Sequence, residues 1–287
     1  MRIGLVLGGG GVVGVAWEIG VLAGLARQRS FDAAASAVIA GISAGAIVGT
    51  RVALGHDLED LVAEQRAPFP VATRTPPNVR GAEPRSVVPD EIMAIITSTE
   101  GTHETRGAAI GRLALRANVA VTDDAFVGTI RTLIGDGDWP ATDLRITTVD
   151  CQSGRTVLWS RFDGIELARA VATSCAVPGW FPAVAHAGRH YTDAPRGDFC
   201  TSLVADAKLD ALVFIGPYVA NDPGMSEVPG LRELTDSGVA VVEIRGGERA
   251  AEVIQDLMDP TRRAVAVAIG LEDGASHAAA VSAACRA

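Results

Sequence analysis

The chain has 287 residues, of which 48% are hydrophobic and 21% charged, so it can bury a sizeable core and is not a disordered chain. Its formal net charge is −9 and it has no basic run, which argues against a nucleic-acid partner. The four cysteines have no C-x-x-C spacing and no apolar run reaches membrane-spanning length, so we expect a cytoplasmic protein whose contact with lipid is peripheral.

The first two predicted strands enclose a glycine-rich turn. Ile3 to Leu7 is an apolar run that ends in glycines, which is typical of the first strand of an α/β protein. After the turn at 8–14, residues 15–27 have helical spacing, and a second buried strand is predicted at 37–40. A strand, a helix and a strand in this order make a βαβ unit, so the sequence predicts a parallel sheet.

The residues after the second strand, 41–45, have the sequence GISAG and fit the pattern G-x-S-x-G. A serine between a buried strand and a helix lies on a strained turn that holds its hydroxyl above the sheet. The dipole of the following helix favours negative charge near Ser43. The same pattern also occurs in plain turns that pack a helix on a sheet. Its flanking residues make Ser43 a candidate nucleophile.

The glycine turn has two interpretations. Gly9, Gly11 and Gly14 match the dinucleotide fingerprint G-x-G-x-x-G, but that fingerprint needs a carboxylate at the end of the second strand. No carboxylate is there, and Asp32 precedes the strand. In the other interpretation, consecutive glycines expose backbone N–H groups near Ser43, and these form an oxyanion hole for a tetrahedral acyl intermediate.

Six of the fourteen prolines lie within 68–89, which predicts an extended surface loop. Helical patterns occur at 57–66, with Asp57 near the start of the helix, and at 90–98, 106–117 and 123–134. We expect 68–135 to be either an insertion that covers the site as a lid or cap, or a plain connecting segment. The remaining elements are strands at 144–149 and 156–160 that pair as a hairpin, a helix at 164–176, a second hairpin over 184–191, strands at 211–215 and 239–244, and helices from about 249.

A serine nucleophile needs a base. Of the five histidines, only His277 has the late position of a Ser-Asp-His hydrolase, and its surroundings indicate an ordinary helical or surface histidine. Asp193 fits better, because it follows a predicted strand at 188–192 and begins a turn that could face Ser43. A carboxylate is a general base where partial burial keeps its pKa near the working pH, although an aspartate at a turn is usually only turn chemistry.

Taken together, four blocks resemble the patatin-like phospholipase family over about residues 1–216. They are GGGVVG at 9–14, GISAG at 41–45, ATSCAVPGWFP at 172–182 and YTD at 191–193. The resemblance implies one domain over 1–287 with a three-layer α/β/α fold, a mostly parallel central sheet and a helical cap. It implies hydrolysis of lipid acyl esters by a Ser-Asp dyad, with no metal or cofactor. Carried over by position, Ser43 is the nucleophile, Asp193 the base, and Gly9, Gly10 and Gly11 supply the oxyanion amides, while residues 178–182 line the acyl pocket.

Two departures from the family pattern bear on activity. Val13 stands where the family usually has Arg or Lys, and Ala194-Pro195 stands where the family usually has Gly-Gly. Pro195 fixes its own φ and restricts Ala194, so the loop that carries Asp193 is expected to differ in shape. Two alternatives therefore remain open: a catalytically weak homologue that binds lipid or a partner, and an acyltransferase with the same dyad. The sequence does not indicate an oligomeric state.

Overall fold

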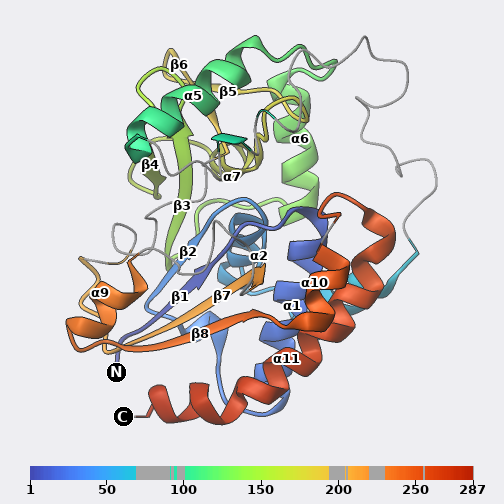
Figure 1. Ribbon diagram of the computed structural model, residues 1–287, viewed down its shortest axis with the longest axis vertical. Helices are drawn as coiled ribbons and strands as arrows, with labels where there is room; N and C mark the ends of the chain where they lie inside the picture. Colours follow the sequence, from blue (N-terminus) through green and yellow to red (C-terminus); the bar gives the residue numbers. More distant parts are fainter. Residues whose placement is uncertain are drawn as a thin grey trace. The chain divides into compact units, whose positions relative to one another are not determined.

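The computed structural model describes residues 1–68, 91, 94–95, 101–193, 204, 206–219, 230–254 and 256–286. The chain divides into two compact units (Figure 1). Unit 1 comprises residues 1–69, 140–145 and 198–287, and unit 2 comprises residues 70–139 and 146–197. Each unit is described by itself below.

Unit 1 is built on parallel strands in the order β2-β1-β7-β8. Their bounds are β1 Ile3–Leu7, β2 Val38–Gly41, β7 Ala211–Val219 and β8 Ala240–Gly246. Leu5 on β1 is in register with Ile39 on one side and Val213 on the other, and all three are fully buried. Continuous apolar runs of this kind belong to parallel strands that are covered on both faces. The predicted parallel sheet is confirmed.

Helices connect and cover these strands. They are α1 Gly11–Arg27, α2 Ala44–Ala53, α3 Leu58–Arg66, α9 Leu231–Asp236, α10 Glu248–Ile254 and α11 Arg263–Ala284, with short 3₁₀ turns at Ala33–Ala35 and Pro260–Arg262. The α3 helix begins where the sequence predicts, because the Asp57 carboxylate accepts hydrogen bonds from the amides of Glu59 and Asp60. The α1 helix begins four residues earlier than predicted, within the glycine turn, and α9 was not predicted.

The α1 and α11 helices pack against each other through glycines (Figure 1). A Cβ atom on Gly20 would lie 2.4 Å from the Val267 carbonyl oxygen, and one on Gly270 would lie 2.2 Å from the Trp17 carbonyl oxygen. Only glycine allows the two backbones to approach so closely. The segment Pro260–Ala284 is also long and apolar enough to span a membrane, although the sequence analysis expected no such segment. Length and composition do not distinguish a span from a core helix, and here the glycine face of α11 is occupied by α1.

The described residues of unit 2 form antiparallel strands and helices. The strands are β4 Thr156–Trp159, β5 Val184–His186, β6 Arg189–Thr192 and the last five residues of β3 Asp143–Asp150. The helices are α5 His103–Arg116, α6 Asp123–Ile134 and α7 Leu167–Cys175. Both predicted hairpins, β3–β4 and β5–β6, are present. Most of the helix predicted at 90–98 lies outside the described residues.

The α5 helix lies against the turn between β3 and β4. A Cβ atom on Gly107 would lie 2.2 Å from the Gly154 carbonyl oxygen, and one on Gly111 would lie 2.4 Å from the Cys151 carbonyl oxygen. The glycines thus let the helix touch the turn backbone. The part of the predicted insertion that is described therefore packs within unit 2, and its role as a lid stays a prediction.

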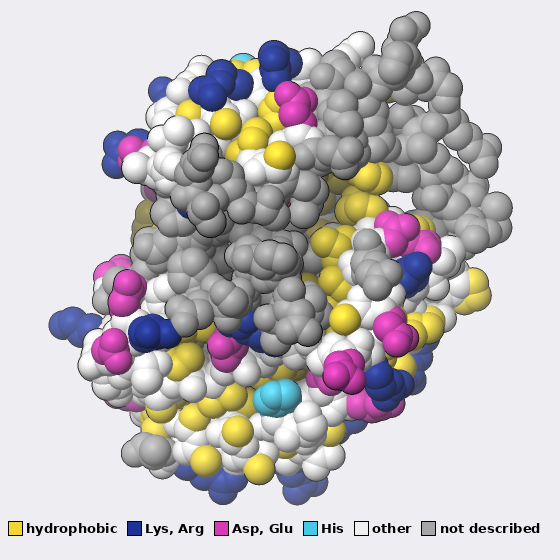
Figure 2. All heavy atoms as spheres, viewed as in Figure 1, with side chains coloured by type: hydrophobic (Ala, Val, Ile, Leu, Met, Phe, Trp, Pro, Cys, Tyr) yellow, Lys and Arg dark blue, Asp and Glu magenta, His cyan; other side chains and the backbone are white. Residues whose placement is uncertain are grey.

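Charged side chains of both signs lie side by side on the face drawn in Figure 2. The described ion pairs include Arg27–Glu59 at 2.7 Å in unit 1 and Arg131–Glu166 at 2.6 Å in unit 2. All four side chains are more than a third exposed, so each pair contributes little to stability.

Candidate active site

Ser43 lies on a sharp turn between β2 and α2. Its backbone has φ 53° and ψ −113°, which is rare for a residue other than glycine. Backbone strain of this kind is found at functional sites, and it is the geometry that presents a nucleophile above a parallel sheet. Ser43 is partly exposed, while its neighbours Ile42 and Ala44 are buried.

The two glycines of the motif are required by close packing. A Cβ atom on Gly41 would lie 2.3 Å from the Gly45 carbonyl oxygen, and one on Gly45 would lie 2.3 Å from the Leu7 carbonyl oxygen. The Gly45 amide also donates to the Gly8 carbonyl at 2.8 Å. The turn that carries Ser43 is therefore pressed against the end of β1, where the glycine turn begins.

The glycine turn runs from Gly8 into α1. Gly11 has φ +57°, and a Cβ atom on it would lie 2.6 Å from the Leu257 carbonyl oxygen. A Cβ atom on Gly10 would lie 2.4 Å from the Cγ atom of Pro217. The amides of Gly10 and Gly11 donate no hydrogen bond to any residue that the structure describes. They are among the first amides of a helix, where such N–H groups point at an anion.

The glycine turn and the serine turn meet within unit 1. A Cβ atom added on Gly14 would lie 3.4 Å from the Cβ atom of Ala44, the residue after Ser43. The start of α2 is therefore in contact with the first turn of α1. The Ala44 amide likewise donates to no described residue. The sequence analysis missed this group, although the signal is present, since the amide that follows a nucleophilic serine is a common oxyanion donor.

Val13, the first departure from the family pattern, is fully buried. Its amide donates to the Leu257 carbonyl at 3.1 Å, which fixes it in the first turn of α1. A valine suits this place, because it adds apolar surface to the core. The other departure, Ala194-Pro195, lies outside the described residues.

Asp193 follows β6 in unit 2. Its amide donates to the Ala176 carbonyl at 3.2 Å, and the Thr192 hydroxyl donates to the same oxygen at 2.7 Å. Two bonds to one carbonyl fix the end of β6 beside the end of α7. Asp193 is half-buried. The pKa of the Cys175 thiol lies well above its usual value, first because the thiol is buried and second because the negative charge of Asp193 acts on it. The two side chains therefore lie close together.

The apolar segment at 178–182 follows α7 as a series of turns. The amides of Trp180 and Phe181 both donate to the Val177 carbonyl, at 3.1 and 2.9 Å. The Phe181 ring stacks on Phe126 of α6, with 4.5 Å between ring centroids. This stacking fixes the segment that the sequence analysis expects to line an acyl pocket.

The predicted site residues thus fall in both units. Ser43 and Gly9, Gly10 and Gly11 belong to unit 1, where the serine and glycine turns are in contact, and Asp193 belongs to unit 2. The pairing of Ser43 with Asp193 stays a prediction.

His277 lies in the second half of α11. Its Nδ1 atom is 2.8 Å from the Asp273 carbonyl oxygen of the same helix. A Cβ atom on Gly24, near the end of α1, would lie 3.2 Å from the Cα atom of Gly274. Since α1 rises about 1.5 Å per residue, this contact is about 20 Å along the helix from the glycine turn. His277 therefore lies far from Ser43.

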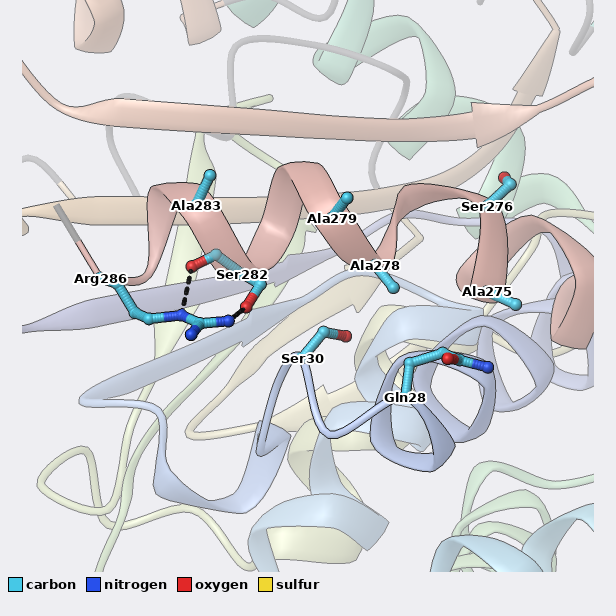
Figure 3. A pocket seen from close by; sticks show the side chains of 9 residues that line it. All are labelled: Gln28, Ser30, Ala275, Ser276, Ala278, Ala279, Ser282, Ala283 and Arg286. Atoms are coloured by element: carbon cyan, nitrogen blue, oxygen red, sulfur yellow. Dashed lines mark hydrogen bonds between the residues drawn. The ribbon is translucent and has the colours of Figure 1, made fainter.

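Among the surface cavities of unit 1 are two that described residues line and Ser43 does not. One, of about 720 Å³, is lined by Gln28, Ser30 and side chains near the end of α11 (Figure 3). The other, of about 830 Å³, includes Ile3 at the start of β1 and His56 just after α2. Both lie toward the amino ends of the strands. Ser43 is at the carboxyl end of β2, which is the edge where parallel sheets bind ligands.

Some solved structures are similar to this chain. VipD from Legionella pneumophila is 11% identical, with a TM-score of 0.41, over 94% of this chain and 67% of VipD. The type III effector protein ExoU is 18% identical, with a TM-score of 0.45, over 98% of this chain and 53% of ExoU. ExoU in complex with SpcU, from Pseudomonas aeruginosa, is 16% identical, with a TM-score of 0.38, over 94% of this chain and 53% of the other. This chain thus spans about half the length of ExoU.

No curated protein matches this chain. The model of the family described as patatin-like phospholipase matches residues 5–194, which is more than half of the chain and includes Ser43 and Asp193. The match confirms the predicted α/β/α class of fold. Members of this family are generally lipid acyl hydrolases. The chain belongs to the patatin-like phospholipase family.

Proposed function

We propose that this protein is a serine hydrolase that cleaves acyl esters of lipids. The observation that carries the proposal is the strained backbone of Ser43, at φ 53°, directly beside a glycine turn with two amides that donate to no described residue. A buried turn that only joined a strand to a helix would have no need of this strain at a serine. Membership in the patatin-like family supports a lipid ester as substrate.

In the proposed reaction, the Ser43 hydroxyl oxygen attacks the acyl carbonyl carbon while Asp193 takes the hydroxyl proton. The carbonyl oxygen becomes an oxyanion and accepts hydrogen bonds from the amides of the glycine turn, Gly9, Gly10 and Gly11. The Ala44 amide and the dipoles of α1 and α2 favour the same charge. The alcohol leaves with the proton held by Asp193, and the acyl group stays on Ser43.

Water then releases the acyl group. Asp193 takes a proton from the water as its oxygen attacks the acyl-serine carbonyl, and the proton returns to the Ser43 oxygen as the acid leaves. Cys175, a thiol on which this carboxylate acts, does not compete as a nucleophile, because burial and the Asp193 charge keep its pKa high and the thiol neutral.

The acyl chain is proposed to lie against the segment at 178–182. Phe181 is held there by its stacking on Phe126, so the wall is apolar and stiff. The insertion at 68–135 is proposed to cover the bound acyl chain as a lid. Apolar walls bind the acyl part of a lipid and do not select its head group.

The hydrolysis of short p-nitrophenyl esters tests the proposal. Ser43→Ala and Asp193→Asn should each abolish hydrolysis in a folded protein, because the first has no nucleophile and the second cannot accept its proton. His277→Ala is the matched control and should keep activity within a few-fold, whereas loss of a triad histidine costs on the order of 10⁴ or more. An active Ser43→Ala variant would overturn the assignment of the nucleophile.

Two further measurements separate the alternatives. A lipid-binding homologue would bind lipid vesicles without releasing acid from them, in the wild type as in Ser43→Ala. An acyltransferase would form the acyl-serine and release it to an added alcohol faster than to water.

A further inference from the structure

Glu18, in the second turn of α1, is an ionisable residue in an unusual place. Its exposed fraction is 0%, and neither carboxyl oxygen has a hydrogen-bond partner among the described residues. Buried carboxyl groups normally have partners, because an unpartnered one costs several kcal/mol in water-to-interior transfer. Its presence is therefore not explained by folding.

The side chain lies beneath the glycine turn. Glu18 is one helical turn after Gly14, on the face of α1 that touches Ala44 and Pro217. Helical side chains lean toward the amino end of their helix, which here is the glycine turn. The Gly8 amide is the backbone group that lowers the pKa of the carboxyl. Its N–H already donates a hydrogen bond to the Ile215 carbonyl at 2.9 Å.

Burial raises the pKa of Glu18 well above its usual value, and the Gly8 amide opposes this only in part. No charged side chain among the described residues acts on it. The charged side chains on the helices that pack against α1 have other partners. Asp273 accepts a hydrogen bond from the Trp17 indole at 2.8 Å. Arg51 donates to the Glu64 carboxylate, and Arg263 donates to the Gln65 side-chain oxygen. The neutral carboxylic acid is therefore the favoured form of Glu18.

We propose, resting on the proposed function, that Glu18 is a positioning residue of the ester hydrolase. As a neutral acid it places a polar but uncharged group beneath the backbone of Gly8 to Gly11, where the amides face the oxyanion. Its full burial keeps it out of contact with substrate. An ionised Glu18 would place a negative charge beneath the oxyanion, so ionisation at alkaline pH lowers kcat.

Three variants test this. Glu18→Met replaces the carboxyl with an apolar group of similar length and should lower kcat about tenfold with KM unchanged, without loss of stability. Glu18→Gln keeps the shape and a neutral polar group, so it should restore most of kcat and lack the fall of kcat at alkaline pH. Thr50→Val is the control, because Thr50 is also fully buried and its hydroxyl has no partner among the described residues, yet it lies two turns below Ser43 in α2.

Stability provides a reading that does not depend on activity. Where the pKa of a carboxyl group is raised in the folded state, the protein loses stability as the pH rises from the pKa of the unfolded state, about 4, toward the pKa of the folded state. Glu18→Gln has no such loss, so its melting temperature should rise above that of the wild type as pH increases.

The proposal is overturned if Glu18→Met keeps the kcat and pH profile of the wild type, or if Thr50→Val changes kcat as much. If Glu18→Met does not fold, the proposal is overturned if kcat of Glu18→Gln falls at alkaline pH as much as kcat of the wild type. A wild type without hydrolysis would refute the proposed function itself, whereas an active wild type with an unaffected Met variant refutes only the role of Glu18.

Discussion

Gly45 lies so close to Leu7 that a Cβ atom on the glycine would be 2.3 Å from the Leu7 carbonyl oxygen. The contact joins the first turn of α2 to the end of β1, and it fixes where the serine turn stands on the sheet. Because the obstacle is backbone, no side-chain rotation relieves it.

Gly45→Ala should therefore destabilise the protein and misplace Ser43. Overpacking typically costs about 1–3 kcal/mol, and a shift of about 1 Å in a reacting group can cost roughly 10²-fold in rate. Urea denaturation and ester hydrolysis measure the two effects. Gly128→Ala in α6 is the control: a Cβ atom there meets nothing within 4 Å, so this change should stabilise the protein by roughly 0.5–1 kcal/mol. Equal stability of the two variants would refute the packing argument.

Asp150 and Arg189 hold the strand that carries Asp193. The Arg189 guanidinium donates two hydrogen bonds to the Asp150 carboxylate, and the amides of Gln152 and Ser153 donate to it at 2.9 Å. Burial alone would raise the pKa of Asp150, but these donors outweigh it and lower the pKa to about 2.

Asp150→Asn should cost about 2 kcal/mol of unfolding free energy at pH 7. A carboxyl group whose pKa is lower in the folded state stabilises the fold when the pH is above the pKa of the unfolded state. This stabilisation is lost as the pH falls through the pKa of the folded state. The difference between wild type and variant should thus shrink from about pH 4 to about pH 2, which urea denaturation at each pH measures. A difference that does not change over this range would contradict the assignment.

Gly270 tests whether α11 is a core helix of unit 1. Gly270→Ala should destabilise by about 1–3 kcal/mol, since the Cβ atom would lie 2.2 Å from the Trp17 carbonyl oxygen. Gly247→Ala, at an exposed glycine with nothing within 4 Å of its Cβ position, should have little effect. Thermal unfolding compares them. If Gly270→Ala melts with the wild type, α1 and α11 do not pack as described.

The sequence predicts well what depends on local pattern. The apolar runs of β1, β2 and β8, the Asp57 cap of α3 and both hairpins follow from residues a few positions apart. The serine turn is also local, because GISAG between a strand and a helix defines its own geometry.

Features that depend on distant contacts were not predictable. Four glycines at 8–11 indicate a turn, yet α1 begins at Gly11, because the turn is enclosed by Pro217 and Leu257, more than 200 residues away. Pro217 also lies within β7, which continues beyond the predicted end at 215. The burial of Glu18 is of the same kind, since only the packed neighbours of α1 decide whether a glutamate in a helix reaches solvent.

The central claim is that Ser43 is an activated nucleophile, and covalent labelling by a fluorophosphonate tests it most directly. Peptide mapping of the folded wild type should find one adduct, on Ser43. Asp193→Asn should label more slowly, and Ser30→Ala, which changes a serine at the cavity of Figure 3, should label like the wild type. Folded wild type that takes no label, or takes it on a residue other than Ser43, would contradict the account.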